Sequence, residues 1–376
     1  MLIVHSARRI DRVHSSTPQL PAAAADWVAV HDGVLLASGS EQSWRSLPDL
    51  ERATVVVAGG RLLTSGWVDQ HCHGAGGVSF DEAVDLTPAL QVHREHGTRA
   101  LIASLVSNPL DVEAAAARRL AAAVRTSGLL VGIHLEGPFL DPSHRGAHAA
   151  HTLRPPRLAD VQALHEACEG TLRQVTLAPE HDENLAVTRW LVSQGVRVAV
   201  GHTSCTYREA LAAFDAGASI LTHAFNAMPG LHHREPGPLG AALDTPHVSL
   251  ELIVDLVHVA PTLVRTLFAA APGRVALVTD AMAATGCAEG TYRLGSLAVQ
   301  VRGGVARLAE GGAIAGSTVT MDEAVRRAVA CGVTLDDAAA AACVVPARAL
   351  GLPTFPAVGT RCDPFLVAED GTAVAA

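Results

Sequence analysis

The sequence predicts an α/β fold: a (β/α)8 barrel of the TIM type with a small β-sandwich domain built from both chain ends. Eight short apolar runs lie between residues 66 and 280, and alanine-rich segments with helical spacing separate most of them. Short β-rich runs broken by polar turns occupy both ends of the chain. A length of 376 residues fits one large barrel with an accessory unit.

The small β domain is expected from residues 1–62 and 346–376. In its first part, WVAVHDGVLLASGS predicts two strands joined at Asp32-Gly33, and ATVVVAGGRLLTSG follows. The tail returns to strands and turns, although Pro364 removes one strand donor. We expect the tail to pair with the amino-terminal strands, which leaves residues 63–345 for the barrel.

The barrel is predicted from continuous apolar strands that alternate with helices, a pattern typical of a parallel sheet covered on both faces. The eight strands begin near Trp67, Arg99, Leu130, Arg173, Val196, Ser219, Ser249 and Arg274. Helices are expected over 83–96, 112–125, 158–169, 183–194, 207–216, 262–270 and 321–331. The link between strands six and seven falls short of a convincing helix, and residues 292–312 resemble a hairpin insertion. A doubly wound sheet is the structural alternative.

Charge and composition exclude several classes of function. All 28 basic residues are arginine against 37 acidic residues, which gives a net charge of -9 without a basic cluster. Nucleic acid is therefore not expected as a partner. Because the chain has no lysine, a Schiff base, a phosphate-loop lysine and a carbamylated lysine between two metals are all excluded.

Cysteine spacing and hydropathy indicate the compartment. The chain has seven cysteines, which are scattered and never form a close pair such as CxxC. A chain of this length does not need a disulfide scaffold, so we expect the reducing cytoplasm. No apolar stretch reaches the roughly 18 residues that span a bilayer, and the amino terminus does not resemble an export signal. Neither membrane insertion nor export is expected.

Side chains able to bind metal recur where the apolar runs end. These are His71, His73, His134, Glu136, His202, His223, Asp255, His258 and Asp280. The ends of barrel strands converge on one rim, where nitrogen and oxygen ligands suit zinc, iron or manganese. Each histidine alone also fits a hydrogen-bonded core position, and His134 fits that interpretation best. Taken together, the set predicts a metal site.

Several motifs carry a family resemblance. They are GWVDQHCHGAGGVSF, GIHLEGPFLDPSHRGAH, GHTSCTYREALAAFDAGASILTHAFNAMPGLHHREPG, VTDAMAATG and AGSTVTMDEAVRRAV. With them the sequence resembles the amidohydrolase superfamily and, within it, the N-acetylglucosamine-6-phosphate deacetylases. The resemblance spans most of residues 66–333. The run HAFNAMPGLHHREPG separates this family from dihydroorotases, which share only the metal ligands.

The resemblance implies a metal centre. Glu136, His202 and His223 would hold the main ion, and His71 with His73 would hold a second one in family members that keep this pair. We expect one or two divalent ions, zinc first, with iron, manganese or cobalt as alternatives. A bound divalent ion lowers the pKa of its water and polarises a carbonyl, which amide hydrolysis at neutral pH requires.

The resemblance also implies the residues that act on the substrate. Asp280 would touch the metal centre and move the proton from the attacking water to the departing amine, while His148 would stabilise the oxyanion. From the sequence alone, a structural histidine at 148 is equally plausible. The implied phosphate contacts are Asn226, the amide of Ala227, His233, His258 and Arg234, the last reaching in from a neighbouring subunit. Without the resemblance, LHHREPG would be interpreted as a solvated loop.

The sequence therefore predicts a cytoplasmic, metal-dependent hydrolase that converts N-acetylglucosamine 6-phosphate to glucosamine 6-phosphate and acetate. A homodimer or higher homo-oligomer is expected if Arg234 acts across an interface. One alternative is another amidohydrolase that acts on a cyclic amide or a different N-acyl sugar. Another is a catalytically silent homologue that only binds a sugar phosphate, although such a protein would need neither the intact ligand set nor Asp280.

Overall fold

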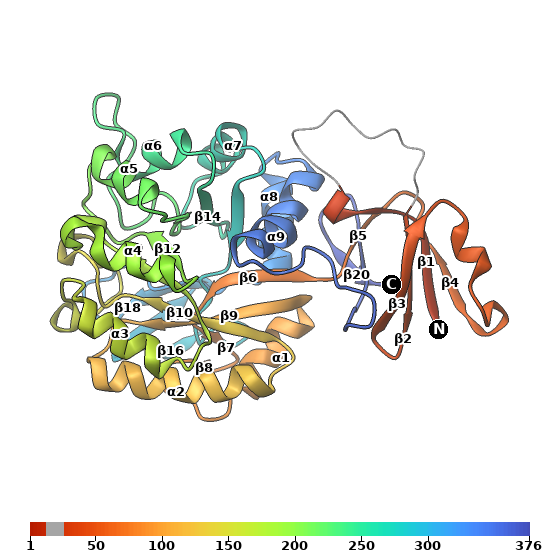
Figure 1. Cartoon of the computed structure of the whole chain (residues 1–376), viewed down its shortest axis with the longest axis horizontal. Coiled ribbons are helices and arrows are strands. Elements are labelled where there is room, and N and C mark those ends of the chain that lie inside the picture. The colour runs from red at the N-terminus through yellow and green to blue at the C-terminus, as the bar shows by residue number, and fades with distance from the viewer. Residues whose placement is uncertain (13–25) are drawn as a thin grey trace.

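The barrel strands lie where the sequence predicts them. The computed structural model describes residues 1–12 and 26–376, so residues 13–25 of the predicted β unit lie outside the described residues. An eight-stranded parallel sheet has the order β15-β14-β13-β12-β11-β10-β9-β6. Its strands are β6 (Trp67–Cys72), β9 (Thr98–Val106), β10 (Leu130–Glu136), β11 (Leu172–Leu177), β12 (Arg197–Val200), β13 (Ile220–Leu221), β14 (Ser249–Ile253) and β15 (Val275–Val278). The expected strand-by-strand order is confirmed. Figure 1 shows the barrel beside the small β domain.

Backbone hydrogen bonds just beyond β15 bring the two ends of this sheet together. The Asp280 amide donates to the His71 carbonyl at 2.9 Å, and the His73 amide donates to the Ala281 carbonyl at 2.7 Å. The Thr279 hydroxyl adds a side-chain hydrogen bond to Asp69 at 2.5 Å. Since first and last strands meet, the sheet is a nearly closed barrel, and the doubly wound alternative is wrong.

The helices follow the predicted ranges closely, with two additions. The expected ones are α1 (Thr87–Glu95), α2 (Leu110–Thr126), α3 (Leu158–Ala167), α4 (Ala186–Ser193), α5 (Tyr207–Asp215), α7 (Pro261–Ala270) and α8 (Met321–Ala330). Helix α6 (Gly237–Asp244) fills the link between strands six and seven, where glycine and proline residues weaken the helical signal. Helix α9 (Leu335–Ala349) was also not predicted. Its start is capped by Thr334, whose side chain accepts from the Asp337 amide.

The small β domain combines both chain ends, as expected. Its strands are β1 (Leu2–Arg9), β2 (Asp26–His31), β3 (Val34–Ser40), β4 (Thr54–Val57), β5 (Leu62–Thr64), β19 (Phe365–Val367) and β20 (Ala373–Ala375). They follow the order β20-β19-β5-β1-β2-β3, and β4 pairs with β1. The predicted pairing of the tail is confirmed, because β19 runs antiparallel to β5 with Leu366 opposite Leu63. The exact domain limits stay a prediction.

The predicted insertion forms a small antiparallel sheet at the site end of the barrel. It contains β16 (Gly290–Leu294), β17 (Leu297–Arg302) and β18 (Val305–Leu308), and a short hairpin of β7 (Gly74–Ala75) and β8 (Val78–Ser79) follows β6. Leu294 and Val299 pack with Val106, Ala147 and Met282 in one buried cluster. The insertion therefore forms part of the wall around the strand ends. Within the described ranges, every helix is too short or too polar to cross a bilayer.

Candidate metal and catalytic site

Three of the predicted site residues adopt a backbone conformation that is unusual for their side chains. His202, His223 and Asp280 follow β12, β13 and β15 with φ angles of 46°, 25° and 48°. Positive φ is costly for residues other than glycine and tends to persist where a functional geometry requires it. Here the sharp turns lie at the carboxyl ends of the strands, and all three side chains line one cavity.

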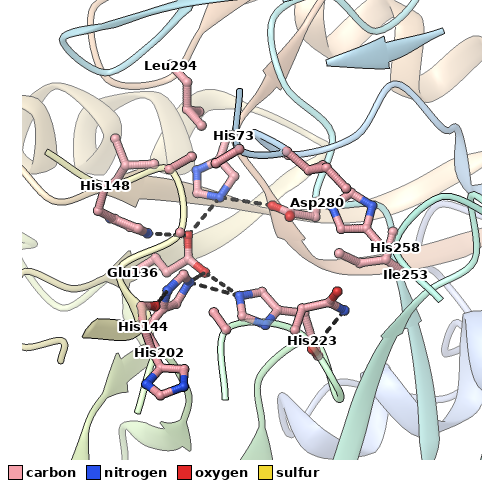
Figure 2. Close-up of a pocket in the computed structure, with 18 of the residues that line it drawn as sticks. His73, Glu136, His144, His148, His202, His223, Ile253, His258, Asp280 and Leu294 are labelled. Atoms are coloured by element: carbon pink, nitrogen blue, oxygen red, sulfur yellow. Dashed lines mark hydrogen bonds and ion pairs between the residues drawn. The ribbon is translucent and has the colours of Figure 1, made fainter. Parts of the chain in front are cut away.

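Glu136, the last residue of β10, lies at the centre of the site (Figure 2). Its Oε1 atom lies 3.2 Å from the Nε2 atoms of His71, His202 and His223. Its Oε2 atom lies 3.1 Å from Nε2 of His73. A single buried carboxylate thus joins four imidazoles from three different strand ends, those of β6, β12 and β13, as the sequence predicts for a metal site.

The outer nitrogens of three of these histidines fix how the rings are protonated. Nδ1 of His73 lies 3.2 Å from the Ser104 carbonyl oxygen, and Nδ1 of His202 lies 2.9 Å from the His144 carbonyl oxygen. Nδ1 of His71 lies 3.0 Å from a carboxylate oxygen of Glu251. Because carbonyl and ionised carboxylate oxygens only accept hydrogen bonds, each Nδ1 donates, and in the neutral ring each Nε2 keeps a lone pair for a metal ion.

These lone pairs provide the test of whether a metal fits. Neutral imidazole nitrogens that face a carboxylate and one another repel unless a cation lies between them. The Nε2 atoms of His71 and His73, both rings with a donating Nδ1, are 3.2 Å apart. The Nε2 atom of His202 lies 2.9 Å from that of His223, whose buried Nδ1 has no hydrogen-bond partner among the described residues. Oriented imidazoles held by outer hydrogen bonds around a carboxylate are the donor set that zinc and similar divalent ions prefer. The residues therefore fit a divalent metal.

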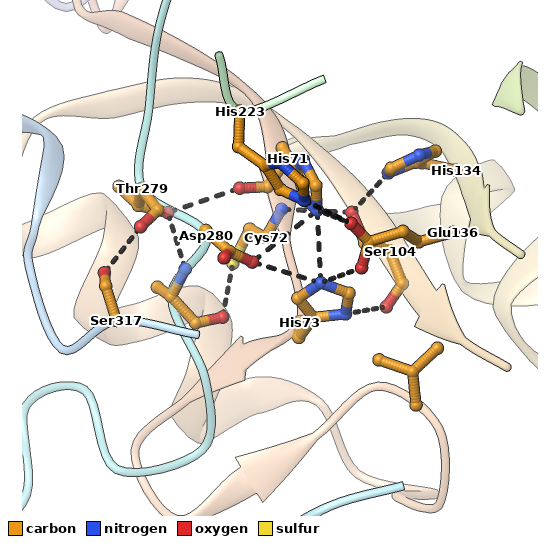
Figure 3. A network of polar contacts seen from close by, with 12 residues as sticks. His71, Cys72, His73, Ser104, His134, Glu136, His223, Thr279, Asp280 and Ser317 are labelled. Atoms are coloured by element: carbon orange, nitrogen blue, oxygen red, sulfur yellow. Dashed lines mark hydrogen bonds and ion pairs between the residues drawn. The ribbon is translucent and has the colours of Figure 1, made fainter. Parts of the chain in front are cut away.

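The arrangement divides into two groups of ligands that share Glu136. One contains His202 and His223, and the other contains His71 and His73. Asp280 borders the second group, with Oδ1 at 3.2 Å from His73 Nε2 and 3.5 Å from His71 Nε2 (Figure 3). The structure thus brings all the predicted metal ligands together, in a geometry that suits one ion or two.

The pKa shifts of His73 and Glu136 also show that the imidazoles and the carboxylates of the site interact strongly. Burial lowers the pKa of His73, but hydrogen bonds to Asp280 and Glu136 outweigh it and raise that pKa to about 9. Burial raises the pKa of Glu136, yet the charge of His71 and hydrogen bonds from other histidines hold it well below its ordinary value. Positive charge is needed beside these carboxylates. A divalent cation supplies it and displaces protons from the imidazoles.

His148 has the opposite orientation to the metal-facing histidines. Its Nδ1 accepts a hydrogen bond from the Ser107 amide at 3.2 Å, so its proton lies on Nε2, 3.4 Å from Oε2 of Glu136. Burial lowers the pKa of His148 to about 4, more than the hydrogen bond to Glu136 raises it, so the ring is neutral at pH 7. A neutral N–H donor that lines the cavity suits the stabilisation of a developing oxyanion.

A cavity of about 340 Å³ opens onto these groups. The predicted residues that line it are His73, Glu136, His148, His202, His223, Asn226, Ala227, His258 and Asp280. His71 lies immediately behind this surface and is fully buried. Apolar side chains, including Leu294 and Ile253, complete the wall (Figure 2).

His258 lies on the far side of Asp280 from His148 (Figure 2). Its Nδ1 is 2.7 Å from Oδ2 of Asp255. Burial lowers the pKa of His258, but the hydrogen bond and charge of Asp255 outweigh it and raise that pKa overall. Asp255, one of the polar strand-end residues, therefore orients His258 instead of joining the metal ligands.

Two predicted substrate contacts lie away from the cavity of their own chain. Arg234 and His233 are exposed, and Arg234 Nη1 lies 2.7 Å from His233 Nε2. They occupy the tip of a turn closed by a bridge between His232 and Glu235. The loop between β13 and α6 carries this turn outward from the barrel (Figure 1). In this structure neither Arg234 nor His233 lines the cavity of its own chain.

Sequence reasoning missed residues that hold the ligands. Glu251 lies inside an apolar run, and the clue was a charged residue in the middle of an otherwise buried strand. His144 acts only through its carbonyl oxygen, which no side-chain pattern shows. The interpretation of His134 as a core residue is confirmed, since its nitrogens lie 2.9 Å from Ser104 Oγ and 2.8 Å from Thr176 Oγ1.

Comparisons with known proteins agree on one family. No family model matches the chain. The chain is 41% identical over 297 residues to N-acetylgalactosamine-6-phosphate deacetylase of Escherichia coli O157:H7, covering 77% of this chain and 78% of that protein. It is 36% identical over 314 residues to N-acetylglucosamine-6-phosphate deacetylase of Mus musculus, covering 78% and 76%.

A solved structure extends the similarity to nearly the whole chain. It is a mutant of N-acetyl-D-glucosamine-6-phosphate deacetylase from Mycobacterium smegmatis in complex with N-acetyl-D-glucosamine-6-phosphate. The two chains are 40% identical and align with a TM-score of 0.87, covering 99% of this chain and 96% of that one. The similarity thus includes both the barrel and the small β domain.

Proposed function

Because the chain belongs to the N-acetylglucosamine-6-phosphate deacetylases of the amidohydrolase superfamily, we propose that it hydrolyses N-acetylglucosamine 6-phosphate to glucosamine 6-phosphate and acetate. The observation that carries the proposal is the cavity in which Glu136 gathers oriented imidazoles while Asp280 and His148 lie beside them. A binding protein would need neither such a donor set nor a carboxylate next to it. The chain is a hydrolase, and the silent-homologue alternative is not favoured.

The metal ligands are assigned by their positions. Glu136, His202 and His223 would hold the main ion, and His71 and His73 with Glu136 and Asp280 would hold a second one. A divalent ion there, with zinc as first choice and iron, manganese or cobalt as alternatives, lowers the pKa of water and polarises an amide carbonyl. The outer hydrogen bonds to His71, His73 and His202 keep the ligating nitrogens pointed inward.

Asp280 and His148 perform the proton and oxyanion chemistry. The Asp280 carboxylate accepts a proton from the attacking water and then donates it to the departing sugar nitrogen. Burial raises the pKa of Asp280, but in the absence of metal the charge of His71 and the hydrogen bond from His73 outweigh it and lower that pKa, so the carboxyl is ionised and can accept a proton. Nε2–H of His148 donates to the acetyl oxygen as negative charge develops there.

The phosphate would lie at the His258 side of the cavity. Asn226, Ala227 and His258 line the cavity, and the Ala227 amide and His258 can donate hydrogen bonds to a phosphate. The Asn226 side-chain amide donates to the His223 and Ala224 carbonyl oxygens at 3.2 Å, so it would have to release one of them to reach a phosphate. Arg234, with His233 beside it, would reach the phosphate from the neighbouring subunit of a homodimer. With a net charge of -9, attraction of an anionic sugar must come from such local donors. We place the enzyme in the cytoplasm, a compartment that its seven free cysteines fit.

Replacing Arg234 by alanine tests the phosphate assignment. The variant should show a KM for N-acetylglucosamine 6-phosphate that is raised by about tenfold to a hundredfold, because a charge-assisted hydrogen bond contributes about 1.5–3 kcal/mol. The KM for unphosphorylated N-acetylglucosamine should stay nearly unchanged. Steady-state acetate release on both sugars measures the difference. Equal effects on the two substrates would remove Arg234 from the phosphate site.

The epimer of the sugar is the second question, because the relative at 41% identity is named for N-acetylgalactosamine 6-phosphate. Acetate release should be measured on both sugar phosphates, with dihydroorotate as the cyclic-amide comparison. We expect the higher kcat/KM on N-acetylglucosamine 6-phosphate and no turnover of the cyclic amide. A higher value on the galactosamine epimer would reassign the substrate. Turnover of dihydroorotate alone would overturn the proposed deacetylation.

A further inference from the structure

A second carboxylate lies inside the barrel, behind the ligands. Glu251 on β14 is completely buried, and its Oε2 atom lies 3.0 Å from Nδ1 of His71. The same oxygen accepts the backbone amide of His223 at 3.4 Å. The Glu251 carbonyl oxygen also accepts the Ala224 amide at 2.7 Å. Glu251 thus contacts one ligand from each of the two groups that share Glu136.

The other carboxylate oxygen of Glu251 already accepts two hydrogen bonds. Its Oε1 atom accepts hydrogen bonds from the side-chain amides of Gln70 at 2.8 Å and Gln174 at 2.9 Å. These two residues come from β6 and β11, so the carboxylate is held from both sides of the barrel interior. Only Oε2 remains for His71, and the orientation of the carboxylate is fixed.

Such a buried anion is costly without a compensating charge. Among the described residues, the partners of Glu251 are two neutral amides, backbone amides and the His71 imidazole. His71 is the one ring through which positive charge at the metal centre can reach it. A carboxylate that accepts from Nδ1 fixes the tautomer of a ligating histidine and increases the basicity of its Nε2.

We infer that Glu251 is a positioning residue that makes the His71–His73 group a binding site for a second metal ion. The inference rests on the metal centre in the proposed function and concerns how many ions the chain holds. Glu251 itself does not touch the substrate cavity. It acts by keeping the proton on Nδ1 of His71, so that the Nε2 lone pair faces Glu136.

The test is Glu251→Gln. The Gln70 and Gln174 amides both donate to the Oε1 position, so the new side chain keeps its oxygen there and turns its NH2 group towards His71. Nδ1 of His71 must then accept, and its proton moves to Nε2, so the tautomer that binds a metal is disfavoured. Titration of the metal-stripped protein with Co²⁺, followed by visible absorption and elemental analysis, counts the ions without any substrate.

We expect two cobalt ions per chain in the unmodified protein. In Glu251→Gln the dissociation constant of one ion should rise by about 10–100-fold, the usual cost of losing such an outer partner. Unchanged binding of two ions by Glu251→Gln would overturn the inference, and so would a single ion in the unmodified protein. If the unmodified protein binds two ions and Glu251→Gln binds one of them more weakly, but the unmodified protein does not deacetylate N-acetylglucosamine 6-phosphate, the result would instead count against the proposed substrate.

Glu113→Gln is the matched control. Glu113 on α2 is also completely buried, and neither of its carboxylate oxygens has a hydrogen-bond partner among the described residues. Burial raises the pKa of Glu113 well above its ordinary value, which favours the neutral carboxyl, so replacement by an amide should change little. The Glu113→Gln variant should bind both ions as tightly as the unmodified protein does. If Glu251→Gln does not fold by circular dichroism, Glu251→Asp takes its place, and normal binding of both ions by that variant would overturn the inference.

Discussion

Asp280→Asn is expected to lower kcat by about two to four orders of magnitude, the range that one general acid–base group contributes. The amide keeps an oxygen near His73 but can neither accept the proton of the attacking water nor return it to the leaving nitrogen. Acetate release measures the loss, and elemental analysis of the same sample reports whether metal is still bound. Turnover near that of the unmodified protein, with metal retained, would show that Asp280 is not the proton carrier.

A suitable comparison is Asp182→Asn. Asp182 is buried, as Asp280 is, but it caps α4 by accepting hydrogen bonds from the Val187 and Thr188 amides at 3.0 and 2.8 Å. It does not line the cavity of the site. This variant should lose some stability, about 1 kcal/mol for a weakened cap, and keep its kcat. A similar loss of kcat in both variants would point to a general effect of removing a buried carboxylate.

Glu136→Gln is expected to lose metal from both ligand groups. The amide nitrogen would donate towards imidazole lone pairs that need a cation, and the negative charge shared by His71, His73, His202 and His223 would disappear. Because a metal contributes several kcal/mol to such a reaction and each 1.4 kcal/mol is a factor of ten, kcat should fall by about a thousandfold or more.

Elemental analysis after dialysis, together with acetate release, measures this effect. The zinc content of Glu136→Gln should fall well below the zinc content of the unmodified protein. Full metal content in Glu136→Gln would mean that Glu136 does not join the two groups, and the assignment of the ligands would be wrong.

Much of the fold could be predicted because the spacing of apolar residues indicates the strands and most of the helices. The buried strands appear as apolar runs, and their order in the sequence is their order in the barrel. Helix α6 was not predicted because its glycine and proline residues weaken helical propensity. In the structure, packing against α5 and β13 holds it in place. Helix α9 escaped because Pro346 resembles the end of a helix, while the structure accommodates it in the last turns.

The site could be predicted as a set of residues but not as a geometry. Strand ends in a barrel converge, so the positions of Glu136 and Asp280 followed from the fold class. The tautomers of His73 and His148 depend on backbone groups of Ser104 and Ser107, which are distant in sequence and carry no motif. The role of Glu251 depends on which neighbours a buried strand meets, which hydrophobic periodicity does not specify.

We propose that these side chains gather around a divalent ion that the hydrolysis needs. The most direct measurement follows metal content and acetate release from N-acetylglucosamine 6-phosphate in the purified protein, after chelation, and after zinc is restored. We expect the purified protein to contain a divalent metal, chelation to abolish acetate release and zinc to restore it. Undiminished hydrolysis by thoroughly stripped protein would show that the reaction needs no divalent ion.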